Sequence, residues 1–279
     1  MRLRIATLLV GHEPKSYLDA HRKVEILMKD LCPSAIRKTL IVDNSKPRVA
    51  YERISEDAVI IGGDNRYREF SGWDLGIAEL ERSRENPDLI HFVTSSFDSM
   101  YAGYLDAFNE EVLEAAYRLQ SVVGHVDYYD QAIELLGRRS QSWLRTSFFF
   151  VPTELVKRLR TVVSVECAEE IFAGIPDAPF RSGAPMSERY RDYIRSWLTG
   201  DGTGQGVVWH SRFDLSRETL PLFEAKVLAI LNEHMLSVRM REAGYPICDV
   251  SWLRSRIDGS PGERLDVHTP WEDQIEARP

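Results

Sequence analysis

The sequence of 279 residues predicts an α/β protein with a mostly parallel sheet flanked by helices and a helical C-terminal part. Two observations predict this class. Short apolar runs alternate with segments whose apolar residues have helical spacing, which is typical of strands joined by helices. Three runs also end in small polar or acidic residues, as buried strands do where a sheet presents a ligand-binding edge. These runs are TLIVDNS, AVIIGGDN and LIHFVTSSFD, and they indicate a small, phosphorylated ligand.

The elements of the first hundred residues follow from this patterning. RIATLLV is the first expected strand, and the segment from Tyr17 to Leu31 carries the apolar residues of an amphipathic helix. A second helix is expected from Gly72 to Arg82, with Ser71 as its N-cap and Asp74 in its first turn. Trp73 is assigned to the core, because aromatic residues at helical spacing are usually buried.

The β/α alternation weakens after residue 100. SVVGHVDYY and RTSFFFVP read as strands, GDGTGQG as a mobile loop that could close over a site, and Gly244 as the stop signal of a long helix. The tail after Ser260 is polar and weakly patterned, so we expect it to wrap the surface or to be partly disordered. Helices are expected over residues 110–119, 153–160, 190–198 and 220–243.

Composition and charge restrict the class of partner. The chain has 35 Lys and Arg against 43 Asp and Glu, and the net charge of -8 argues against a nucleic acid as the main partner. No apolar run is long enough for a transmembrane segment, and the N-terminal run has no signal-peptide cleavage pattern. We therefore expect a cytoplasmic protein, with membrane association and oligomeric state left open. Three widely spaced cysteines are expected to be reduced thiols: Cys32, Cys167 and Cys248.

Polar residues directly after the expected strands are candidates for ligand binding. Asp43 and Asn44 follow one strand and could meet a nucleobase, although Asp-Asn-Ser is also ordinary turn chemistry. Gly62 and Gly63 allow a ligand to approach the backbone, and Asn65 adds an amide. Asp74, in the first turn of its helix, could bind sugar hydroxyls. These residues predict the donor side of a site.

A second polar group lies in the strand that begins near residue 121. His125, Asp127, Tyr128 and Asp130 offer side chains suited to a hydroxyl acceptor, and a plain polar strand end is the alternative. Arg145 could meet a phosphate or form a structural ion pair. The common P-loop, zincin and α/β-hydrolase motifs do not occur in the sequence.

Four segments, in their order and spacing, resemble nucleotide-sugar glycosyltransferases of the GT-A type, especially bacterial enzymes of polysaccharide biosynthesis. They are IVDNS, GGDNRYREFSGWDLGIAE, RTSFFFVPTELVKRL and NEHMLSVRMREAGY. The resemblance implies a GT-A-like, Rossmann-like catalytic domain over residues 1–259. Its donor-binding half would be residues 1–100 and its acceptor half residues 101–259, followed by a tail over residues 260–279.

The resemblance also implies how the diphosphate is held. GT-A enzymes usually carry a DxD motif that binds a divalent cation, Mn or Mg, against the two phosphates. Here the matching stretch reads Ser95-Ser96-Phe97-Asp98, so only Asp98 could be such a ligand. His268 could be the C-terminal histidine that completes the metal site, although a lone histidine in a polar tail is usually a surface residue.

The same resemblance points to the catalytic base. In the family's acidic pair, the second acid commonly deprotonates the acceptor hydroxyl. This chain has Glu233 followed by His234, and either side chain can accept a proton. The alternative is that Glu233 is a solvated helix residue paired with an arginine.

The expected function is therefore transfer of a sugar from a nucleotide-sugar donor to a hydroxyl of a glycan, a lipid-linked substrate or a small molecule. Two alternatives stay open. A sugar-phosphate nucleotidyltransferase is disfavoured because LLVGHEPKS has only one glycine after the first strand. A noncatalytic carbohydrate- or nucleotide-binding protein of the same fold would fit the incomplete DxD motif. Fold analogy does not decide among them.

Overall fold

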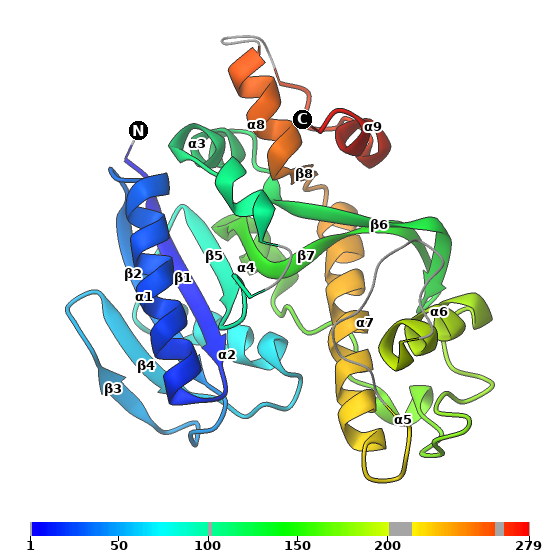
Figure 1. Cartoon of the computed structure of the whole chain (residues 1–279). Coiled ribbons are helices and arrows are strands. Elements are labelled where there is room, and N and C mark those ends of the chain that lie inside the picture. The colour runs from blue at the N-terminus through cyan, green and yellow to red at the C-terminus, as the bar shows by residue number, and fades with distance from the viewer. Residues whose placement is uncertain (1, 100–101, 201–213, 260–264, 279) are drawn as a thin grey trace. The chain divides into compact units, whose positions relative to one another are not determined.

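The computed structural model describes residues 2–99, 102–200, 214–259 and 265–278. It contains one mixed, mostly parallel sheet with strand order β3-β4-β2-β1-β5-β7-β6-β8, flanked by helices (Figure 1). β1 pairs in parallel with β2 and β5, while β3 and β7 each pair antiparallel with a neighbour. The strands are β1 (Arg4–Gly11), β2 (Ile36–Asp43), β3 (Tyr51–Arg53), β4 (Ala58–Gly62), β5 (Leu89–Thr94), β6 (Val122–Leu135), β7 (Arg138–Pro152) and β8 (Ile247–Asp249).

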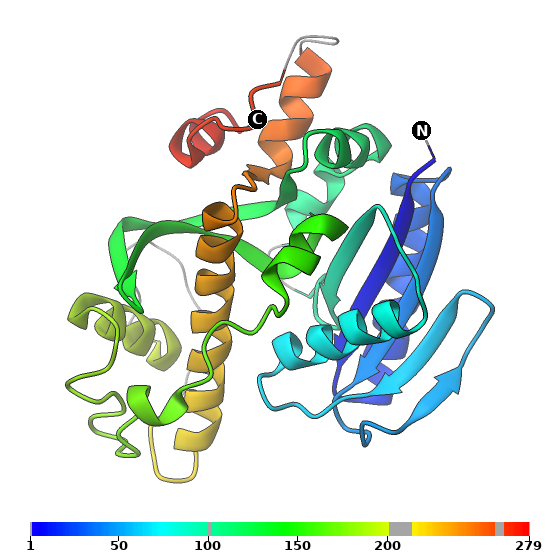
Figure 2. The same cartoon turned by 180° about the vertical axis from the view of Figure 1, so that it is seen from behind.

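Helices cover both faces of the parallel strands. α1 (Pro14–Leu31) lies in front of the sheet in Figure 1, whereas α2 (Glu69–Arg82) lies on the opposite face and comes to the front in Figure 2. The remaining helices are η1 (Gly103–Ala107), α3 (Glu110–Arg118), α4 (Thr153–Leu159), α5 (Ala168–Ile171), α6 (Glu188–Thr199), α7 (Leu220–Glu242), α8 (Val250–Gly259) and α9 (Trp271–Glu276). None of the helices in the described part of the chain is both long and apolar enough to cross a membrane.

The chain divides into two compact units. Unit 1 comprises Met1–Asp127, Leu144–Val162 and Arg239–Pro279, and unit 2 comprises Tyr128–Trp143 and Val163–Val238. These units describe which segments pack together and do not concern ligand binding. The division into a donor-binding half (residues 1–100) and an acceptor half (residues 101–259) therefore remains a prediction. The expected loop over residues 200–206 lies, from residue 201 onward, outside the described residues.

The core of unit 1 explains why its elements form. The strands β1, β2 and β5 are buried along most of their length because they are central in the sheet and covered on both faces. Trp73 of α2 is 0% exposed, as expected, and its indole nitrogen donates to the backbone oxygen of Leu8 at 3.1 Å. The rings of Phe70, Phe92 and Phe149 meet it edge-on.

Several local expectations need correction. α2 begins at Glu69 rather than Gly72, and Ser71 lies inside the helix, where its hydroxyl donates to the backbone oxygen of Arg68. The short edge strand β3 was missed, because all three of its residues are exposed and carry no apolar alternation. The tail after Ser260 is expected to wrap the surface or to be partly disordered, and its described part forms the short helix α9 and buries Gln274 to 2% exposure.

Unit 2 has its own apolar core. α7 contributes Phe223, Val227 and Leu231, each 0% exposed, and α6 contributes Tyr190 and Ile194.

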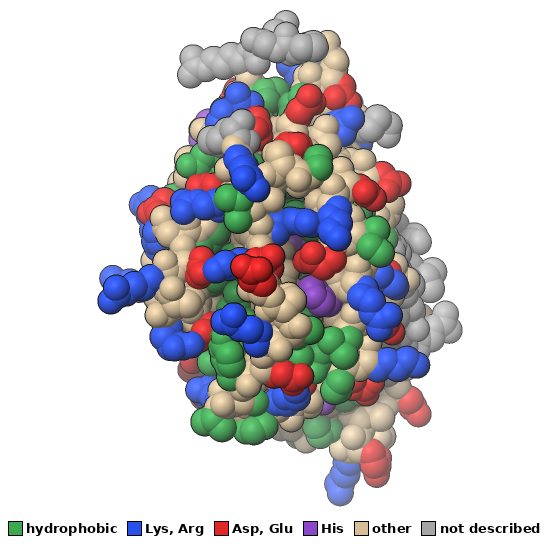
Figure 3. Space-filling model, turned by 90° about the vertical axis from the view of Figure 1, so that its left-hand side faces the viewer, with side chains coloured by type: hydrophobic (Ala, Val, Ile, Leu, Met, Phe, Trp, Pro, Cys, Tyr) green, Lys and Arg blue, Asp and Glu red, His purple; other side chains and the backbone are tan. Residues whose placement is uncertain are grey.

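The surface carries charges of both signs. On the face of the molecule shown in Figure 3, Lys and Arg are interspersed with Asp and Glu. All three cysteines are free thiols.

Candidate functional site

The parallel strands of unit 1 end at one edge, where the order of the strands reverses. From β1 the chain continues to β2 and β4 on one side, then returns to β5 on the other side of β1. Gly11 is in register with Asp43, and Asp43 with Gly62, so these strand ends are level. Ligands of α/β proteins bind at such a reversal, outside the carboxyl ends of the strands. We call this place the carboxyl edge.

Asp43 organises the loop at the end of β2. Its side chain is 0% exposed and accepts hydrogen bonds from the Tyr17 hydroxyl at 3.0 Å and from the Ser45 amide and hydroxyl at 2.9 and 2.6 Å. Burial, together with the neighbouring Asp43 carboxylate, raises the pKa of Tyr17 to about 12, so the phenol stays a donor. Both oxygens of Asp43 are thus engaged within the protein, and its predicted contact with a nucleoside remains a prediction.

Two asparagines meet at the carboxyl edge. The Asn44 amide donates to the backbone oxygen of Arg68 at 3.0 Å and lies 3.5 Å from the Asn65 side-chain oxygen. A Cβ atom at Gly63 would lie 2.1 Å from the Asn44 side-chain oxygen, so only glycine allows this approach. Asn65 and Arg68 have φ values of 53° and 55°, a left-handed conformation that asparagine tolerates better than most residues. Asn65 is half-buried, whereas Asn44 is only 8% exposed.

Basic side chains flank the same loop, and the sequence analysis did not single them out. Arg48 pairs with Asp64. Burial alone would raise the pKa of Asp64, but its hydrogen bonds to Arg48 and to the Arg66 amide hold that pKa below its ordinary value. The exposed Arg66 guanidinium lies 5.1 Å from the centre of the Tyr67 ring. The sequence NRYR, with Arg66 and Arg68 just after a strand end, could have indicated these basic residues, because an anionic ligand at a strand end requires positive charge nearby.

The segment after β5 holds the residues expected to face the diphosphate. The amide of Ser95 donates to the Val10 backbone oxygen at 2.9 Å, which fixes the start of this turn beside β1. Ser95 is half-buried and Ser96 is exposed. Asp98 lies in an ion pair with Lys23, at 2.5 Å. Its carboxylate therefore already has a cationic partner.

A metal site requires several His, Cys, Asp or Glu side chains close together. Among residues 2–99, 102–200, 214–259 and 265–278, no group of three or more His, Cys, Asp or Glu is placed to hold a metal ion. His268 is exposed in the tail, where its amide donates to the Asp266 carboxylate at 3.0 Å. A divalent cation held by Asp98 and His268 therefore remains a prediction.

Asp74 anchors a neighbouring loop. Its carboxylate accepts hydrogen bonds from the Val162 amide at 2.7 Å and from the Thr161 hydroxyl. These contacts stabilise the chain just after α4, where Arg160 has a φ of 64°. The structure thus shows a structural role for Asp74, and its predicted contact with sugar hydroxyls remains a prediction.

The predicted acceptor residues His125 and Asp127 lie together on β6. Their side chains approach to 3.3 Å, and Arg145 of β7 donates to Asp127 at 3.0 and 2.8 Å. Burial by itself would raise the pKa of Asp127, but His125 and Arg145 outweigh it and lower that pKa, so the carboxylate is charged at neutral pH. The ring of Tyr104 stacks on His125, with centres 5.0 Å apart.

The same cluster includes two residues that the sequence analysis missed. Asp249, at the end of β8, is 0% exposed and lies 3.7 Å from the His125 ring. It accepts from the Val126 amide at 3.0 Å and from Arg278 of the tail at 2.5 Å. Asp249 could have been found, because PICD is another short apolar run that ends in an acid. Nothing in the sequence around Arg278 indicates its partner.

Asp130 does not join this cluster. It belongs to unit 2, is exposed, and lies 3.4 Å from Arg189 of α6. An exposed ion pair of this length contributes little to stability.

The two candidates for the base differ sharply in exposure. His234 is 2% exposed and hydrogen-bonds with the Tyr190 hydroxyl and, at 3.3 Å, with the Tyr129 hydroxyl. Burial raises the pKa of both tyrosines, so they stay protonated. Glu233 is half-buried. Both candidates lie in unit 2, within or beside an aromatic cluster formed by Tyr129, Trp143, Tyr190, Tyr193 and His234.

Comparison with known proteins finds similarity among solved structures alone. No family model and no curated protein sequence matches the chain. The mannosyltransferase PcManGT from Pyrobaculum calidifontis, in a structure with GDP-Man and Mn2+, matches with a TM-score of 0.37 and 9% sequence identity. The match covers 88% of this chain and 76% of that chain. Similarity at this level does not establish a shared fold, so the function is inferred from the residues of this chain.

Proposed function

We propose that the chain is a glycosyltransferase that moves a sugar from a nucleotide-sugar donor to a hydroxyl acceptor. The observation that carries the proposal is the carboxyl edge, where Asn44, Asn65 and Ser95 lie at the reversal of strand order between β1 and β5. The sequence resemblance to GT-A enzymes points to the same residues. A nucleotide-sugar is a phosphorylated ligand of the kind that such an edge binds.

Each residue at the edge has a proposed role. Asn65, the more accessible of the two asparagines, would hydrogen-bond the nucleoside, and Asp43 would hold the loop in shape. Ser95 and Ser96 would donate to the diphosphate. Arg66, in the adjacent loop, would offset its negative charge, because a leaving diphosphate must be stabilised as its charge develops.

The reaction requires one base and one leaving group. The base takes the proton of the acceptor hydroxyl while the oxygen forms a bond to the anomeric carbon. The bond from that carbon to the diphosphate oxygen breaks, and the nucleoside diphosphate leaves with the electron pair. Glu233 is the proposed base because its side chain is partly accessible, whereas His234 is buried. His125 and Asp127 are proposed to bind the acceptor.

The test combines binding with turnover. Melting temperatures would be measured with UDP, GDP, dTDP, ADP and CMP, each with and without manganese, because a ligand of the native state raises its apparent stability. The matching nucleotide-sugars would then be assayed for release of the nucleoside diphosphate with simple glycan acceptors. We expect one nucleoside diphosphate to raise the melting temperature and its sugar conjugate to be consumed.

Variants connect the result to the carboxyl edge. Asn65→Asp is nearly isosteric and tolerates the same backbone conformation, but it replaces the amide proposed to bind the nucleoside with a negative charge beside an anionic ligand, so binding should weaken. Glu81→Gln, an exposed position on α2, is the matched control and should bind like the wild type. If no nucleotide shifts the melting temperature, the donor assignments at the edge are wrong.

A noncatalytic binding protein is the second candidate, and specific contacts favour it. His234 is enclosed by two tyrosines, and Asp98 is paired with Lys23. Both groups would then be unavailable for chemistry. Nucleotide binding without consumption of any nucleotide-sugar would support this alternative.

A further inference from the structure

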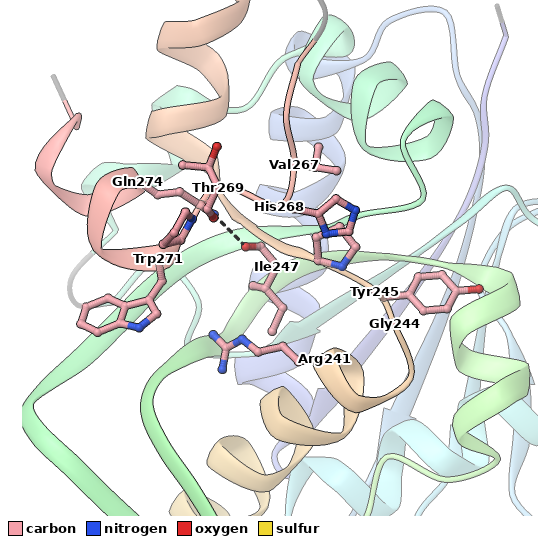
Figure 4. Close-up of a pocket in the computed structure, with 11 residues that line it drawn as sticks. Arg241, Gly244, Tyr245, Ile247, Val267, His268, Thr269, Trp271 and Gln274 are labelled. Atoms are coloured by element: carbon pink, nitrogen blue, oxygen red, sulfur yellow. Dashed lines mark hydrogen bonds between the residues drawn. The ribbon is translucent and has the colours of Figure 1, made fainter.

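A pocket with a volume of about 300 Å³ lies at the start of β8 in unit 1 (Figure 4). Two segments form it: Arg241 to Ile247, which joins α7 to β8, and Val267 to Gln274 of the tail. Among the residues expected to act in sugar transfer, His268 alone lines this pocket. The pocket is therefore built from residues other than those of the carboxyl edge.

The described residues that line the pocket include one arginine, one histidine, one tyrosine and one tryptophan, and no Asp or Glu. Arg241 projects from the end of α7 on the same side as Trp271, and the ring of His268 lies on the other side (Figure 4). Burial lowers the pKa of Arg241 to about 10, and the nearby Glu272 opposes this effect. The guanidinium is thus still charged at neutral pH.

The side chain of Gln274, which lines the pocket, forms hydrogen bonds with the protein through both its oxygen and its nitrogen. The Gln274 side-chain oxygen accepts from the Asp249 amide at 2.7 Å. Its nitrogen donates to the backbone oxygens of Ile247 at 3.3 Å and Thr269 at 2.8 Å. These bonds hold the tail against β8. The charge of Arg241 and the ring of Trp271 are the groups of the lining whose chemistry suits an aromatic anion.

We propose that this pocket binds a small organic anion, a carboxylate or phosphate monoester carried on a flat ring. A guanidinium presents two parallel donors that match either anion. Trp271 and the flanking prolines supply flat apolar surface for a ring, whereas the ring of Tyr245 points away from Arg241 and Trp271 (Figure 4). The volume is at the lower end of the range for small-molecule sites, which suits one ring with one anionic group.

The test is calorimetric titration of the full chain with phenyl phosphate and benzoate. Inorganic phosphate and benzyl alcohol separate the contributions of the charge and of the ring. We expect at least one of the two aromatic anions to bind and both partial probes to bind much more weakly. If neither aromatic anion binds, the proposal is wrong. Equal binding of inorganic phosphate and phenyl phosphate would contradict the role of the ring.

Variants then locate the site. Arg241→Gln should weaken binding by about tenfold or more, since it removes a charge-assisted hydrogen bond, and Arg241→Lys should weaken it less. Arg254→Gln, at an exposed ion pair on α8, is the matched control. Trp271→Ala tests the ring surface independently if Arg241→Gln fails to fold. Wild-type affinity in both Arg241→Gln and Trp271→Ala would overturn the proposal.

The result is independent of the proposed transferase function. Nucleotide binding at the carboxyl edge should be unchanged in Arg241→Gln, because Arg241 is absent from the contacts described there. If nucleotides bind and aromatic anions do not, only the pocket proposal is wrong. If aromatic anions bind and nucleotides do not, only the donor assignments at the carboxyl edge are wrong.

Discussion

The carboxyl edge of unit 1 and the aromatic cluster of unit 2 both hold polar side chains out of water, but they are assembled differently. At the edge, Asp43 is the last residue of β2 and Asn44 directly follows that strand, and the Asp43 carboxylate accepts from the Ser45 amide two residues away. In the cluster, His234 meets Tyr129 and Tyr190, which are 105 and 44 residues away along the chain.

This difference determines what each group can do. Loop residues at the ends of strands keep one side toward solvent, so a ligand can reach the half-buried Asn65 and Ser95. A histidine inside a packed helix is enclosed by whatever packs against it. His234 therefore resembles a core residue with satisfied hydrogen bonds, although it occupies the position where the sequence suggested a base.

The largest effect is expected at Trp73, behind the carboxyl edge. Trp73→Ala removes a side chain that is 0% exposed and should lower the free energy of unfolding by about 3–5 kcal/mol, measured by urea denaturation. The exposed Leu222→Ala in α7 is the control and should change it by less than about 0.5 kcal/mol. A small loss at Trp73 would mean that the edge does not depend on this packing.

The aromatic cluster is tested by His234→Phe. The change removes a hydrogen-bond partner that two buried tyrosine hydroxyls share, so the free energy of unfolding should fall by up to about 3 kcal/mol. Glu233→Gln keeps the size of the side chain, so it should lower the melting temperature less than His234→Phe does and, if Glu233 is the base, should slow sugar transfer by about a hundredfold or more. Unchanged stability with lost transfer in His234→Phe would instead make His234 the base.

A pH titration tests a third buried group, His91 of β5. Burial lowers its pKa from 6.5 to about 3, so the folded chain resists a proton that the unfolded chain accepts. The free energy of unfolding should fall as the pH drops below 6.5, by about 2 kcal/mol at about pH 5.

His91→Leu should flatten this dependence, whereas His12→Gln, at an exposed position, should not. Denaturation curves between about pH 7 and pH 5 avoid the carboxylates, which titrate mainly at lower pH. An unchanged slope in His91→Leu would show that His91 is not the cause.

The smallest effect is expected at Asp74. Asp74→Asn keeps the shape but removes the charge that accepts from Val162 and Thr161, so the loss should be about 1 kcal/mol. Nucleotide binding should be unchanged if the role is structural. Weaker binding with unchanged stability would restore the predicted contact with the donor sugar.

The sequence by itself determined the α/β class, the central strands and the core position of Trp73. These features depend on periodicity within a few residues and on the chemistry of strand ends, which are local properties. It also indicated that Asp43, Asn44 and Asn65 follow strands, and the parallel pairing then placed those strand ends at one edge.

Tertiary structure alone decided which of these groups keep access to solvent. The pairing of Asp98 with Lys23, the enclosure of His234 and the link from Arg278 to Asp249 each join segments far apart in the sequence. The pocket at β8 exists only because the tail packs against Ile247. Burial and pairing depend on contacts between distant segments, and no local pattern in the chain encodes them.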